Sequence, residues 1–103
     1  MLFSRILTQL KVLRIHGESD VTVSHVTRDS REVRAGTVFC AISGENFDGH
    51  TVIHSLDATV LVLERWVDPP AGVVTVLVDD TRVALGVIAA LLAGEPSKKL
   101  SLV

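Results

Sequence analysis

The sequence has a single cysteine, no cluster of basic residues and no long apolar run. Cys40 therefore has no partner for an internal disulfide, and it lies in an apolar stretch, so we expect it to pack as a small hydrophobic residue in a reducing compartment. The 10 lysines and arginines are scattered, which argues against a nucleic-acid partner. Polar residues interrupt the N-terminal segment MLFSRILTQLKVLRI, which excludes a signal-peptide core or a membrane span there. We expect a cytoplasmic protein with no membrane partner.

Length and composition indicate one small globular domain over residues 1–103. The chain has 103 residues, a net charge of −2 and 48% hydrophobic residues. A domain of this size buries a modest core, so a ligand or neighbouring domain would contribute noticeably to its stability.

Apolar runs alternate with polar segments along the chain, and this alternation predicts an α/β fold. Four runs rich in β-branched residues predict strands at residues 21–26, 37–42, 59–64 and 73–78. A short helix capped by Ser4 is expected before them, with its apolar face formed by Ile6, Leu7, Leu10 and Leu13. The final residues KLSLV have the composition of one more strand.

A second helix is predicted over residues 82–93, between capping residues Asp79, Asp80 and Thr81 and the terminating Gly94 and Pro96. Its core stripe is expected to comprise Val83, Ala84, Val87, Ile88, Leu91 and Leu92. Leu85, Ala89 and Ala90 leave little polar face, so we expect something besides its own sheet to cover this helix.

The polar stretch GENFDGH, residues 44–50, directly follows a predicted buried strand. Gly44 and Gly49 permit positive φ and exposed amide groups, Asn46 donates and accepts hydrogen bonds, and Phe47 offers a face to a ring. Loops at the carboxyl ends of strands are where α/β sheets usually hold ligands. An ordinary strand-to-helix turn, with Asp48 as the helix cap, explains the same composition.

A second polar stretch, TRDSREVRAG at residues 27–36, offers further ligand groups. Ser30 supplies a hydroxyl, and Arg28 and Arg31 supply forked donors suited to phosphate, although Asp29 would partly neutralise them in a surface ion pair.

Other chemistries find weaker support. The sequence lacks the Gly-Lys-Ser/Thr of a nucleotide phosphate loop, and it lacks the HExxH signature of zinc proteases. His50 and His54 have the spacing of metal ligands on one helix face, with Asp48 as a third, but no cysteine lies near them. Neither Cys40 nor Ser30 has an identifiable partner base. We therefore assign no catalytic residue and no metal site.

Taken in order, these elements resemble a known family. The stretch RDSREVRAGTVFCAISGENFDGHTVI is similar to the pattern DSR-x-V-x-x-G-x-x-F-x-A-x-x-G-x-x-x-DGH of the amino-terminal domain of the Mur ligases, which act in peptidoglycan precursor synthesis. The segment from Val78 to Val103 resembles the helix and Pro-Ser element of the tripeptide synthetases, the MurE type, so the resemblance extends from about Val21 to the last residue. The segment after His50 is shorter than usual in the family by roughly one helical turn.

The resemblance implies a small mixed sheet of four to five strands flanked by helices. It also implies that the chain binds the uridine diphosphate end of UDP-N-acetylmuramoyl-L-alanyl-D-glutamate and does not itself catalyse ligation. ATP and magnesium would belong to a central domain and the incoming amino acid to a carboxy-terminal domain, both absent from this chain. The central domain would be its partner within one polypeptide.

The family pattern also carries expectations for individual residues. Those expected to contact the substrate are Arg28, Ser30, Gly44, Glu45, Asn46 and Phe47, and those expected to shape the loop are Asp48, Gly49 and His50. The alternatives are the same domain of the D-alanyl-D-alanine-adding Mur ligase, or a stand-alone regulatory or interaction module.

Overall fold

The computed structural model describes residues 1–42, 58–69 and 72–94. In chain order its elements are α1 (Phe3–Leu7), β1 (Val12–His16), β2 (His25–Thr27), the short 3₁₀ helix η1 (Ser30–Glu32), β3 (Thr37–Cys40), β4 (Val60–Leu63), β5 (Val74–Val78) and α2 (Thr81–Ala93).

The five strands form one mixed sheet in the order β1-β5-β4-β3-β2. Strands β2 to β5 are parallel to one another, and β1 pairs antiparallel with β5 at one edge. The carboxyl ends of β2, β3, β4 and β5 therefore lie along the same edge of the sheet, which we call the carboxyl edge. This architecture confirms the α/β fold and the mixed sheet that the sequence predicted.

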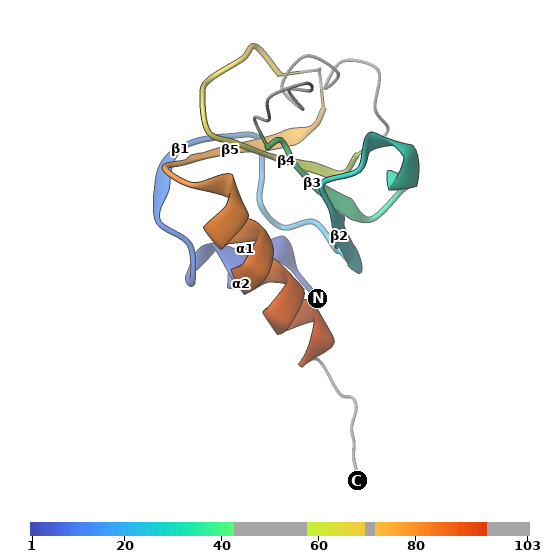
Figure 1. Cartoon of the computed structure of the whole chain (residues 1–103). Coiled ribbons are helices and arrows are strands. Elements are labelled where there is room, and N and C mark those ends of the chain that lie inside the picture. The colour runs from blue at the N-terminus through green and yellow to red at the C-terminus, as the bar shows by residue number, and fades with distance from the viewer. Residues whose placement is uncertain (43–57, 70–71, 95–103) are drawn as a thin grey trace, which may run out of the picture.

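Both faces of the sheet are covered. The helix-side cluster joins alternate residues of the strands to both helices, and its buried members include Phe3, Ile6, Val38, Val60, Val76, Ala84 and Ile88. Figure 1 shows α1 and α2 together on this side of the sheet. The opposite cluster comprises Phe39, Ala41, Ala58, Leu61 and Leu63. Strands β3 and β4 are buried at every position, as their continuous apolar sequences predicted.

The N-terminus of α2 is held by two carboxylates. Asp80 is the N-cap, and its side chain accepts from the backbone N–H groups of Arg82 and Val83. Glu64, at the end of the neighbouring β4, accepts from the Thr81 hydroxyl at 2.7 Å and from the Thr81 N–H at 3.0 Å. The predicted cap is confirmed, and carboxylates here also complement the helix dipole.

The N-terminal segment differs from its prediction. Helix α1 has Leu2 rather than Ser4 at its N-cap, without a side-chain cap bond, and it ends at Leu7. Leu13 belongs to β1, where it is 56% exposed, rather than to the apolar face of a helix. The register of β1 against β5 explains the difference, because pairing with a long buried strand stabilises residues 12–16 more than one further helical turn would.

The other elements keep their predicted types with altered bounds. Strand β2 covers only His25–Thr27, because the preceding Val21 and Val23 instead bond through their backbones to Phe3 and Met1. Helix α2 ends before Gly94, as predicted. Pro96, His54 and the terminal KLSLV lie outside the described residues. Among the described residues, no helix is long and apolar enough to cross a membrane.

The prediction that Val83 belongs to the core stripe of α2 is wrong. Ala84 and Ile88 are buried and Val87, Leu91 and Leu92 are half-buried, but Val83 is 63% exposed because it faces away from the sheet.

This difference predicts unequal costs for truncating Ile88 and Val83, two of the β-branched residues of α2. Ile88→Ala should lower the free energy of unfolding by roughly 2–5 kcal/mol through lost burial and a cavity, whereas Val83→Ala should change it by about 0.5 kcal/mol or less. Urea unfolding of both variants measures the difference, and equal losses would show that Val83 is part of the core of this chain.

Candidate functional site

The described part of the candidate site is the crossover that connects β2 to β3. It starts at the carboxyl edge with Arg28, forms η1, crosses the face of the opposite cluster, and reaches the amino end of β3 at Gly36. Val33 packs partly buried against the opposite cluster. The crossover is thus anchored at both ends and in its middle.

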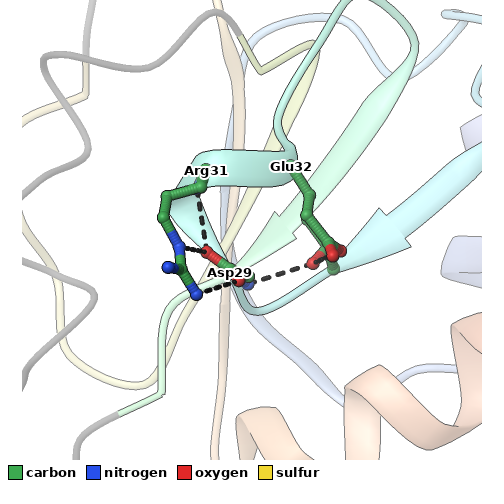
Figure 2. A network of polar contacts seen from close by, with 4 residues as sticks. Asp29, Arg31 and Glu32 are labelled. Carbon is green, nitrogen blue, oxygen red and sulfur yellow. Dashed lines mark hydrogen bonds and ion pairs between the residues drawn. The ribbon is translucent and has the colours of Figure 1, made fainter.

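A network of polar contacts fixes the first turn of this crossover (Figure 2). The Thr27 hydroxyl donates to Glu32 Oε1 at 2.9 Å and accepts from the Asp29 N–H at 3.0 Å. The Asp29 carboxylate accepts from the Arg31 N–H at 2.9 Å and from Arg31 Nε and Nη2 at 3.1 and 3.0 Å. These bonds from Asp29 cap η1 and hold the guanidinium in a two-point pair.

The same pair sets the local electrostatics. The hydrogen bond from the Arg31 side chain lowers the pKa of the Asp29 carboxyl, with the Arg31 backbone N–H adding to the effect. The expected neutralisation of an arginine by Asp29 is confirmed for Arg31. Arg28 is exposed and, in the described part of the chain, has no ion pair or hydrogen bond.

Two of the residues expected to contact substrate are left available by this network. Ser30 is half-buried at the start of η1, and its hydroxyl makes no hydrogen bond within the described residues. Arg28 and Ser30 thus lie between tied neighbours at the carboxyl edge. The other predicted residues, Gly44, Glu45, Asn46, Phe47, Asp48, Gly49 and His50, lie outside the described residues.

At its far end the crossover is closed by Gly36. Its N–H donates to Thr59 Oγ1 at 2.8 Å, and its carbonyl accepts from the Ser24 N–H at 2.9 Å. Its φ is +84°, in the left-handed region. A Cβ at this position would lie 3.2 Å from Ser24 Oγ, so the tight approach of three segments requires glycine.

Some residues near the crossover were missed by the sequence analysis. His25, Arg31, Glu32, Val33 and Arg34 line a shallow depression of about 440 Å³ beside β2. His25 and Arg34 carried no signal, because only the folding of the crossover back over the sheet brings them together. Arg14 stacks over the Trp66 ring at 4.0 Å from its centroid.

The described residues offer little to a metal or to covalent catalysis. They contain no group of three or more histidine, cysteine, aspartate or glutamate side chains that could hold a metal ion. Cys40 is fully buried in β3, and this burial raises the pKa of its thiol to about 12. A thiol so protonated at neutral pH is a poor nucleophile.

Comparisons with known proteins agree with this geometry. A family model described as "Mur ligase family, catalytic domain" matches residues 22–92. UDP-N-acetylmuramoyl-L-alanyl-D-glutamate–2,6-diaminopimelate ligase from Bacillus licheniformis is 35% identical over 107 residues, covering 100% of this chain and 22% of that protein. The corresponding ligase from Aquifex aeolicus is 39% identical over 84 residues, covering 79% of this chain and 17% of the relative.

The chain belongs to the Mur ligase family. Its similarity to the tripeptide synthetases, predicted from the DSR and DGH motifs together with the segment from Val78 to Val103, is confirmed. A solved structure, MurF from Acinetobacter baumannii, has a TM-score of 0.71 and 27% identity, covering 85% of this chain and 20% of that chain. This Mur ligase chain spans about a fifth of the length of its curated relatives, and it covers 22% of the Bacillus licheniformis ligase.

The close approach at Gly36 predicts opposite effects for two glycine-to-alanine substitutions. Gly36→Ala should lower the free energy of unfolding by about 1–2 kcal/mol, because alanine is strained at this φ. Gly86→Ala should raise it by roughly 0.5–1 kcal/mol, because a helix interior favours alanine and nothing lies within 4 Å of the added carbon. Thermal unfolding of both variants tests the pair, and a neutral Gly36→Ala would contradict the assigned backbone geometry.

Proposed function

We propose that this chain is the amino-terminal domain of a MurE-type ligase and binds the uridine diphosphate end of UDP-N-acetylmuramoyl-L-alanyl-D-glutamate. The observation that carries the proposal is the arrangement of the first turn of the crossover. Thr27, Asp29, Arg31 and Glu32 are tied to one another, whereas the Arg28 guanidinium and the Ser30 hydroxyl are left at the carboxyl edge.

The chemistry of these two groups suits a diphosphate. Arg28 supplies a charged, forked donor, and Ser30 supplies a neutral donor from a half-buried position. Asp29 compensates Arg31, and Glu32 offsets the charge of Arg28, so the first turn carries no net formal charge, which suits a ligand held mainly by directed hydrogen bonds. Phosphate groups also commonly bind backbone N–H groups of glycine-containing loops, and Gly44, Glu45, Asn46 and Phe47 are proposed to supply these and the uracil contacts. Asp48, Gly49 and His50 are proposed to shape that loop.

In this proposal the chain binds and positions substrate and does not perform the chemistry. Binding energy from the uridine end, remote from the reacting carboxylate, would help to orient that carboxylate for ligation elsewhere in the polypeptide. The described residues do not fit a metal site and the sequence lacks a nucleotide phosphate loop, so we place ATP and magnesium outside this chain.

Two other functions remain as outcomes of the tests. The solved structures similar to this chain include UDP-N-acetylmuramoylalanyl-D-glutamyl-2,6-diaminopimelate–D-alanyl-D-alanyl ligase from Acinetobacter baumannii. The same domain of that enzyme is therefore the first alternative. The chain sequence after Val103 in the parent polypeptide would distinguish it. A stand-alone interaction module would retain the fold and bind no uridine nucleotide.

Removal of the Ser30 hydroxyl should weaken uridine nucleotide binding. Ser30→Ala is expected to raise the Kd for UDP-N-acetylmuramoyl-L-alanyl-D-glutamate about tenfold, the loss typical of a hydrogen bond to a charged group. Isothermal titration calorimetry of the chain measures this change. Ser19→Ala is the matched control, because Ser19 lies in the connection between β1 and β2 near the amino end of the sheet. Equal affinities for both variants and the unaltered chain would overturn the assignment of Ser30.

A further inference from the structure

The outer face of α2 is unusual for a helix that borders solvent. Its exposed positions are Arg82, Val83, Gly86, Ala89, Ala90 and Ala93. At 100° per residue these six positions form one continuous stripe opposite the buried Ala84 and Ile88. Only Arg82 in the stripe is charged, whereas surface helices normally carry polar residues along their outer face. We call these six residues the α2 outer face.

A small apolar hollow adjoins the first turn of this face. It has a volume of about 50 Å³ and lies between α2 and the connection from α1 to β1, with Leu10, Val83 and Val87 among its lining residues. Lys11 and Asp79, paired at 3.5 Å, stand at its rim. Protein interfaces typically have an apolar centre surrounded by polar groups. The exposed Val83, the apolar hollow and the charged pair at its rim have this arrangement.

We infer that the α2 outer face docks against the polypeptide that follows residue 103 in the same protein. This inference rests on the proposed function, because it takes the chain to be one domain of a longer ligase. The relatives support that premise, since the chain covers only 22% of the Bacillus licheniformis ligase. Helix α2 is also the last described element, so a polypeptide that follows residue 103 is joined to this helix through residues 95–103.

The size of the face favours a tethered domain over a second copy of the chain. A 13-residue helix is about 20 Å long and about 10 Å wide, so its outer face offers roughly 200 Å². A stable complex between separate proteins usually buries about 800 Å² on each partner. A covalently linked domain needs less contact, because a short tether gives an effective concentration on the order of millimolar.

Cysteine footprinting tests the docking directly. Cys40 is buried with a pKa of about 12, so a cysteine introduced at an exposed position of this chain is the reactive one near neutral pH. Ala90→Cys and Val83→Cys report on the α2 outer face, and Ala35→Cys, at another exposed alanine in the crossover, is the matched control. Each variant is treated with a maleimide in the 103-residue chain and in the full-length polypeptide, and modification is followed for each peptide by mass spectrometry.

If the α2 outer face docks in this way, cysteines placed on it should react with the maleimide more slowly in the full-length polypeptide than in the 103-residue chain. Cysteines at positions 83 and 90 should react about tenfold or more slowly there, as expected if the docked face opens for a tenth of the time or less, while position 35 reacts equally in both. Equal rates at position 90 in the two proteins would overturn the inference. So would slowing that depends on the concentration of the 103-residue chain, because that result would identify a second copy as the occupant.

Failure of this inference is distinguishable from failure of the proposed function. The footprint uses no nucleotide, and nucleotide binding is measured on the 103-residue chain without the following polypeptide. A covered α2 outer face in a protein that binds no uridine nucleotide would retain the docking and reject the substrate assignment. Binding of the nucleotide with an uncovered face would do the reverse.

Discussion

The burial of β3 and β4 on both faces is the constraint on which the rest of the arrangement depends. Their eight residues are all buried, so one set of side chains packs with the helices in the helix-side cluster and the other set belongs to the opposite cluster, against which Val33 and Val67 pack. Because β2 to β5 are parallel, the chain has to cross from one end of the sheet to the other after each strand. These crossings place the segments that leave β2 and β4 at a common edge, where Asp29 is the N-cap of η1 and Glu64 accepts hydrogen bonds from Thr81 at the start of α2.

The same constraint accounts for the short path of the crossover between β2 and β3. It contains no α-helix, so a single turn of 3₁₀ helix, the half-buried Val33 and the left-handed Gly36 bring the chain back to the amino end of the sheet. Most polar side chains of its first turn form hydrogen bonds that hold the chain on this path. The two side chains that form no such bond, Arg28 and Ser30, stand on backbone that the bonds of their neighbours hold in place, and an ordered backbone lowers the entropic cost of binding a ligand. The bonds that hold this connection therefore also position the candidate site.

The sequence predicted the parts of this molecule whose residues have only one plausible environment. Continuous apolar runs identified the buried strands, the Asp80 cap identified the start of α2, and the DSR motif led to a correct family and to the Asp29 ion pair. The sequence analysis failed at β1, because Leu13 follows Leu7 and Leu10 at helical spacing although it is an exposed residue of an edge strand. Strand order and the bond between Glu64 and Thr81, which are 17 residues apart, depend on tertiary contacts that no local pattern encodes. The roles assigned to residues 44–50 stay predictions.

We propose that the carboxyl edge next to β2 binds a uridine nucleotide. Nuclear magnetic resonance titration of the 103-residue chain with UDP-N-acetylmuramoyl-L-alanyl-D-glutamate tests it most directly, because each backbone amide reports separately. We expect chemical-shift changes concentrated at residues 28–32, reproduced in part by UDP and absent with ATP. A folded chain whose amides at these residues are unaffected by the uridine ligands, or that responds equally to ATP, would contradict it.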